Sequence, residues 1–127
     1  MAQPVVHFEI IGEDPAGLRA YYGELFDWDF QSAPVAPEVS QTDSYAFIDR
    51  ITTDDGTGIP GGVGGGQAYR SHTVFYVGVA DVEDALQKAE ALGGKRVMGP
   101  ARNEGGGVVV GHFTDPGGNL IGVAGPA

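Results

Sequence analysis

VVHFEIIGEDPAGLRAYYGELFDWDF, residues 5–30, shows the pattern of a strand, a capped helix and the start of a second strand. Phe8 and Ile10 occupy one side of the first strand, because side chains alternate along an extended chain. Asp14 followed by Pro15 is a typical helix start, with a capping carboxylate before a residue tolerated in the first turn. The residues that recur with the spacing of one helix face are Leu18, Tyr21, Tyr22 and Leu25.

The same pattern returns in HTVFYVGVADVEDALQKAEALGGKRV, residues 72–97. An offset of 67 residues places Phe8 on Phe75 and Asp14 on Asp81 without a gap. Gly93 and Gly94 are the stop signal of the second helix. The repeat predicts two similar modules, about residues 5–63 and 72–125, within a single domain that covers residues 1–127.

Shorter segments with strand character complete each half, at residues 28–30, 44–50 and 59–63 and at residues 95–98, 108–114 and 120–124. Each half therefore has the order βαβββ, and each helix needs a sheet to cover. We predict an α+β fold in which two βαβββ modules form a curved mixed sheet, an open cup, with one helix per module on the convex side. The residues expected in the two helix-on-sheet cores are Phe8, Ile10, Leu18, Tyr22, Phe75, Val77, Leu86 and Leu92.

The composition excludes several kinds of partner and site. The chain has 17 Asp and Glu against seven Lys and Arg, a formal net charge of −10. We expect no nucleic-acid partner, because phosphate binding relies on clustered basic residues. The absence of cysteine excludes thiolate ligands and thiol nucleophiles. No apolar run could span a bilayer and no signal peptide is recognisable, so we expect no membrane partner and a cytoplasmic location.

The second face of each half's first strand points into the cup, and it carries His7, Glu9, His72, Val74 and Tyr76. These five are the predicted ligand-binding residues. His7 and Glu9 stand two residues apart, so both side chains enter the same concavity, where they could hold a ligand's polar group. The alternative is that they satisfy each other or a backbone group at a wet sheet edge. His112 is expected to be a core or rim residue rather than a ligand.

Several motifs in this order resemble one protein family. HFEI, then Asp14, Tyr21-Tyr22 and LFDW, then Asp81 and ALGGK, then FTDPGGNLIG resemble the vicinal oxygen chelate superfamily. That superfamily includes glyoxalase I, extradiol dioxygenases, fosfomycin-resistance enzymes and bleomycin-binding resistance proteins. The resemblance covers nearly the whole chain and implies paired βαβββ modules. It also implies a homodimer, in which the cup is formed within one chain or across two.

In the enzymes of this family, His and Glu side chains on the first and last strands of each module hold a divalent metal. The resemblance places His7 at one such position. The equivalent in the second module is Val74, with His72 two residues earlier, and the position of the last-strand acid is Gly122. The first module's last strand offers only GIPGGV. One of four ligand positions is filled, so we expect no cofactor; the alternative is a divalent metal with His7 as one of its ligands.

Three hypotheses of function follow. The preferred one is a metal-free cup that binds an apolar or cationic small molecule, as the bleomycin-binding relatives do. The alternative is a metal-dependent lyase, isomerase or dioxygenase, with His7 as one metal ligand and Glu9 as base or further ligand. A third is a structural or regulatory protein with an empty cup. Net charge and Glu9 together favour a ligand that is partly apolar and neutral or cationic.

Overall fold

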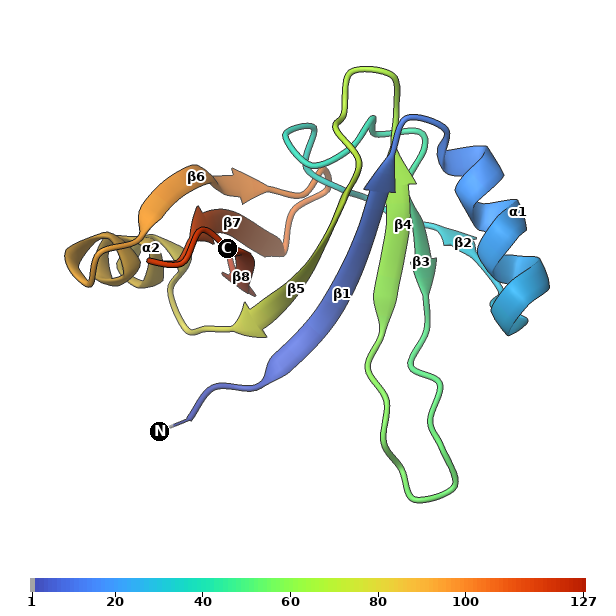
Figure 1. The fold of residues 1–127 in the computed structure, drawn as a ribbon, viewed down its shortest axis with the longest axis horizontal. Helices are drawn as coiled ribbons and strands as arrows, with labels where there is room; N and C mark the ends of the chain where they lie inside the picture. Colours follow the sequence, from blue (N-terminus) through green and yellow to red (C-terminus); the bar gives the residue numbers. More distant parts are fainter. Residues whose placement is uncertain (1) are drawn as a thin grey trace.

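The computed structural model describes residues 2–127, which form ten elements (Figure 1). They are, in chain order, β1 (Val5–Gly12), α1 (Pro15–Phe26), β2 (Gln31–Ser32), β3 (Ala46–Ile48), β4 (Gly61–Gly65), β5 (His72–Gly78), α2 (Val82–Ala91), β6 (Lys95–Arg102), β7 (Val108–Thr114) and β8 (Leu120–Pro126).

All eight strands belong to one mixed sheet with the order β2-β3-β4-β1-β5-β8-β7-β6. The last strand of each module runs parallel to its first strand, as β4 does beside β1 and β8 beside β5. The two modules join where β1 and β5 pair antiparallel, with His7 opposite Tyr76 and Glu9 opposite Val74. The α+β fold class predicted from the repeat is therefore confirmed.

The two helices lie on the face of the sheet opposite to Glu9. Asp14 and Asp81 cap them as predicted, each accepting a bond from a backbone amide three residues later, at 3.0 and 2.9 Å. Helix α1 contacts β1 and β4, whereas α2 contacts β6, β7 and β8. Among residues 2–127 neither helix covers β5, so the middle of the convex face is open between them.

Two residues predicted in the core are exposed instead. Phe75 is 42% exposed, because it lies on the convex side of β5 where no helix reaches it. Leu92 is 71% exposed at the C-terminal cap of α2, and α1 has no fully buried residue. Leu86 is fully buried, as predicted, against Val82 and Val123.

Several strand limits also differ from the sequence prediction. Residues 28–30 precede β2 instead of forming a strand, since Trp28 packs on Tyr22, Phe26 and Phe8 with ring centroids 5.1–5.6 Å apart. Strand β3 is shorter than residues 44–50, because the chain leaves the sheet after Ile48 into an exposed loop. Strand β6 continues beyond residue 98 to Arg102.

A loop in the first module closes one end of the concave face. Val35, Ala36 and Val39 are buried there at 0–4% exposure, in a cluster with Val74 on β5 and further residues of both modules. The Ser40 hydroxyl fixes the loop to β4, where it accepts a bond of 2.8 Å from the Gly65 amide. The cup is therefore filled at this end and open only at the other.

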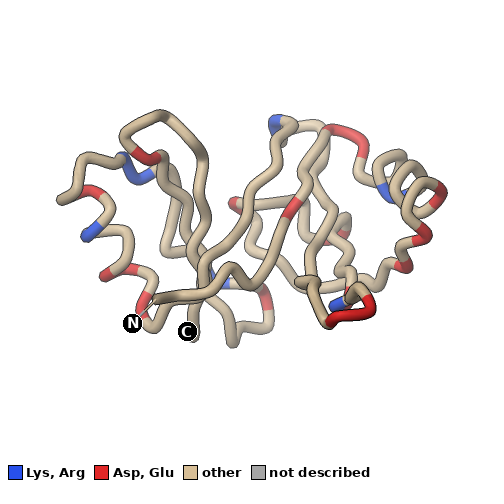
Figure 2. The backbone as a smooth tube through the Cα atoms, turned by 60° about the horizontal axis from the view of Figure 1, so that its bottom comes forward, with Lys and Arg blue, Asp and Glu red and all other residues tan. Residues whose placement is uncertain are grey.

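No helix within residues 2–127 is long and apolar enough to cross a membrane. Acidic residues are spread over both modules (Figure 2), in agreement with the net charge of −10.

Candidate ligand-binding site

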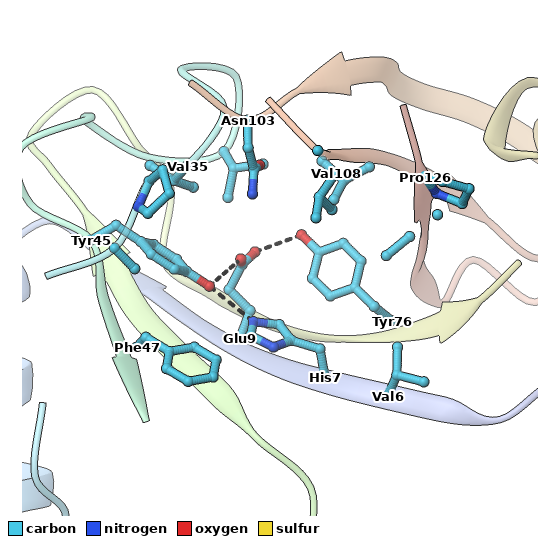
Figure 3. Close-up of a pocket in the computed structure, with 17 residues that line it drawn as sticks. Val6, His7, Glu9, Val35, Tyr45, Phe47, Tyr76, Asn103, Val108 and Pro126 are labelled. Atoms are coloured by element: carbon cyan, nitrogen blue, oxygen red, sulfur yellow. Dashed lines mark hydrogen bonds between the residues drawn. The ribbon is translucent and has the colours of Figure 1, made fainter. Parts of the chain in front are cut away.

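The open part of the cup is a cavity of about 510 Å³. It lies on the concave face, and residues of both modules of one chain line it, from Val6 on β1 to Pro126 on β8 (Figure 3). Most of its wall is apolar. The polar side chains on it are His7, Glu9, Tyr45, Tyr76 and Asn103.

Glu9 is the centre of the polar wall and is only 3% exposed. The Tyr76 hydroxyl donates to its Oε1 at 2.7 Å, and the Tyr45 hydroxyl donates to its Oε2 at 2.9 Å. Each tyrosine in turn meets a histidine. His7 Nε2 lies 3.0 Å from the Tyr45 hydroxyl, and His112 Nε2 lies 2.7 Å from the Tyr76 hydroxyl.

Burial determines the ionisation of this five-residue network. Desolvation raises the pKa of Glu9 to about 7, although the hydrogen bonds from both tyrosines oppose the shift. Desolvation also lowers the pKa of His7 and of His112 to about 4. The pKa of each tyrosine is raised by burial and by the nearby carboxylate. At neutral pH the two imidazoles are thus neutral, and Glu9 is the group whose charge changes.

Two glycines give the tyrosine rings their room. A Cβ on Gly62 would lie 2.0 Å from the Tyr45 hydroxyl, and a Cβ on Gly122 would lie 2.5 Å from Cδ2 of Tyr76. Gly62 is opposite Glu9 on β4, and Gly122 is opposite Tyr76 on β8. Each module therefore contributes one tyrosine that lies over a glycine and points its hydroxyl at Glu9.

The profile of the Glyoxalase/Bleomycin resistance protein/Dioxygenase superfamily matches residues 5–123. The chain belongs to this superfamily. A variant of the Streptomyces coelicolor methylmalonyl-CoA epimerase, in complex with 2-nitronate-propionyl-CoA, is similar in structure with a TM-score of 0.70 and 17% identity, over 100% of this chain and 99% of that one.

Two further solved structures show the same likeness. The epimerase from Mycobacterium tuberculosis gives a TM-score of 0.63 at 14% identity, over 97% of this chain and 87% of that one. A hypothetical protein from Bacillus halodurans C-125 gives 0.66 at 13% identity, over 100% and 96%. No curated protein matches the sequence. At these identities the likeness concerns the fold.

The residues present do not fit the superfamily's metal site. Tyr76 occupies the space that a side chain at Gly122 would need, so this tyrosine and an acid at that position exclude each other. Val74 is 5% exposed in an apolar cluster, and His7 Nε2 is already bonded to Tyr45. In the described part of the chain, no three His, Asp or Glu side chains are grouped so that they could hold a metal ion.

The predicted site residues are divided between the cavity and its closed end. His7, Glu9 and Tyr76 line the cavity together. Val74 and His72 share their face of the sheet but do not line the cavity. Val74 is packed in the cluster with the loop residues Val35 and Val39. The His72 ring lies 6.2 Å from that of His112, with its Nδ1 2.7 Å from the Arg70 carbonyl.

Sequence reasoning missed two members of the network. Tyr45 precedes β3 and is 7% exposed, and His112 on β7 is 6% exposed. A signal for Tyr45 exists, because it shares its phase with Phe47 in the alternating segment at residues 44–50 and both line the cavity. His112 was expected in the core or rim, and it is buried there with a hydrogen bond to Tyr76.

Proposed function

We propose that this protein binds a small, mainly apolar organic molecule in the concave cavity, without a metal ion. The observation that supports this most directly is the cavity itself, in which apolar side chains surround one buried carboxylate. Its volume of about 510 Å³ is typical of pockets that enclose a drug-sized ligand. His7, Glu9 and Tyr76 are the proposed polar contacts. Metal-dependent lyase, isomerase or dioxygenase chemistry is the less favoured alternative, since the donor set does not fit.

A thermal-shift screen tests this proposal. A panel of small apolar molecules with different polar groups is added to the protein in the presence of a chelator, and we expect some to raise its Tm. Val108→Trp should abolish the shift, because Val108 lines the cavity and is 42% exposed, so a larger side chain can enter without disturbing the core. Val97→Trp is the matched control, since Val97 is 55% exposed and lies outside the cavity.

Two results would count against metal-free binding in this cavity. Ligands that stabilise Val108→Trp as strongly as the parent chain would bind elsewhere. Elemental analysis after purification without chelator provides the second criterion. Near one equivalent of zinc, nickel, iron or manganese, lost in His7→Ala, would instead restore the metal-dependent alternative.

We also propose that two copies of the chain pair through the convex face. A groove there is lined by Phe8, Tyr22, Phe26, Trp28 and Phe75, and Phe26 and Phe75 are 53% and 42% exposed. Phe8 and Phe75 are opposite each other at the junction of the modules, so a two-fold axis through the junction would place this patch against itself. Glu9 and Asp115 also line this groove, but most of its lining is apolar, which suits burial between two copies of the chain.

Sedimentation analysis tests the pairing. Phe75→Lys should give a monomer at concentrations where the parent chain is a dimer, whereas Val97→Lys should leave the mass unchanged. A parent chain that sediments as a monomer would refute the proposal.

A further inference from the structure

We infer that the ligand's polar end is a hydrogen-bearing cation, a primary or secondary ammonium or an amidinium group, because the network around Glu9 uses its own hydrogens and leaves only acceptors for a ligand. This inference rests on the proposed function and names the class of molecule that the cavity takes. It follows from counting the hydrogens of the network.

The two tyrosines have no hydrogen left to offer. A phenol carries one hydroxyl hydrogen, and the Tyr45 and Tyr76 hydroxyls lie 2.9 and 2.7 Å from the two oxygens of Glu9. A buried carboxylate with no basic partner needs both of these donors. Each tyrosine hydrogen is therefore directed at Glu9.

The same count fixes the tautomer of each histidine. His7 Nε2 is 3.0 Å from the Tyr45 hydroxyl and His112 Nε2 is 2.7 Å from the Tyr76 hydroxyl. Since the tyrosine hydrogens are directed at Glu9, these contacts require a hydrogen on each Nε2. A neutral imidazole has one hydrogen, so Nδ1 of both rings is an acceptor. Both rings are neutral at pH 7, because burial lowers their pKa to about 4.

The chain of donors thus runs inward from both histidines through the tyrosines to Glu9. Figure 3 shows the bonds that link His7 to Tyr45 and both tyrosines to Glu9. Each carboxylate oxygen accepts one hydrogen and has capacity for another. Of the polar side chains that line the cavity in the described chain, Asn103 alone carries hydrogens outside this network, and it stands across the cavity from Glu9 (Figure 3).

This arrangement discriminates between ligands. An ammonium group can donate to Glu9 and cancel a buried charge that has no cationic partner in the cavity wall. At Glu9, a carboxylate, ester or thioester would bring acceptors to a network that offers only acceptors, and would leave them unpaired there. A quaternary ammonium has the charge but no hydrogen. The remaining wall, which includes Val6, Phe47 and Val108, suits an apolar or aromatic body.

Four probes of similar size separate the effects of positive charge, donated hydrogens and apolar contact. They are phenethylamine, its N,N,N-trimethyl derivative, 3-phenylpropionate and propylbenzene, each measured by calorimetry or, for the least soluble, by thermal shift. The measurements are made near pH 8, where Glu9, with a pKa of about 7, is mainly ionised. We expect the primary amine to bind at least ~10-fold tighter than the quaternary amine and ~100-fold tighter than the acid.

Two matched variants test whether Glu9 causes the preference for the amine. Glu9→Gln removes the charge and adds amide hydrogens at nearly the same shape, so the preference for the amine over the acid should fall by at least ~10-fold. Glu13→Gln changes the net charge equally at an exposed position outside the cavity and should leave the preference intact. Equal losses in both variants would mean that the overall charge selects the cation, and would overturn the inference.

The remaining outcomes distinguish this inference from the proposed function. Binding of 3-phenylpropionate or propylbenzene as tight as that of the amine, abolished by Val108→Trp, would leave a small-molecule site but refute an acceptor-only network around Glu9. If none of the four probes binds or raises the Tm, both the inference and the proposed function fail for molecules of this size.

Discussion

Replacing Tyr76 by phenylalanine removes one oxygen atom that two buried groups share. The hydroxyl donates to Glu9 and accepts from His112, both at 2.7 Å, and the residue is 2% exposed. The ring and its packing over Gly122 remain, so the loss comes from the two unpaired partners. A buried polar group left without its partner costs about 1–3 kcal/mol, so with two such groups we expect Tyr76→Phe to lower the free energy of unfolding by about 2–6 kcal/mol.

Urea denaturation followed by the fluorescence of Trp28, the single tryptophan, measures this loss. Tyr22→Phe is the control, because the ring of Tyr22 is half-buried and packs on Trp28 without a hydroxyl partner in the network. The pKa of Glu9, followed by NMR, should also rise further in Tyr76→Phe, since the lost hydrogen bond lowers it in the parent chain. A change in unfolding free energy equal to that of the control would refute the described network.

Three further predictions concern the core, the glycine beneath the Tyr76 ring and stability in acid. Leu86→Ala should cost about 2–4 kcal/mol in chemical denaturation, since Leu86 is 0% exposed, whereas Leu92→Ala, at 71% exposure, should cost less than about 0.5 kcal/mol. Gly122→Ala should lower stability by about 1–3 kcal/mol, because its Cβ would lie 2.5 Å from Tyr76; an unchanged Tm would contradict this. The pKa of His112 is lowered to about 4 in the folded chain, so its contribution to stability is present above pH 6.5, the usual value, and declines by up to about 3 kcal/mol as the pH falls through 4. A variant His112→Gln that loses stability in acid as steeply as the parent chain would show that another group is responsible.

The internal repeat and the alternation along the strands made most of the fold predictable. An offset in the sequence identified both modules, and period two assigned His7, Glu9 and Tyr76 to one face, where the structure brings them together. That information is local to each strand. Which residues meet across strands depends on the pairing register, so Tyr45 and His112, on segments far from β1 in the sequence, could not be connected with Glu9.

The sequence also left the role of two glycines undetermined. Considered alone, Gly62 indicates a weak strand, and Gly122 indicates a missing acid. Their role depends on the aromatic ring that lies over each of them, which is a property of neighbouring strands. The closed end of the cup was unpredictable for a similar reason. The loop around Val35 and Val39 has no periodicity, yet it is buried against Val74.

The junction of β1 and β5 has a consequence for the way the protein comes apart. These two strands are neighbours at the centre of the sheet. Glu9 lies on β1 and Tyr76 lies on β5, one on each side of this junction. A module cut out at residue 66 would expose a bare strand edge, which is prone to aggregate, and would contain only half of the cavity. Separation of the modules therefore breaks the β1–β5 pairing and opens the cavity at the same time. A molecule bound in the cavity contacts both modules and so opposes their separation.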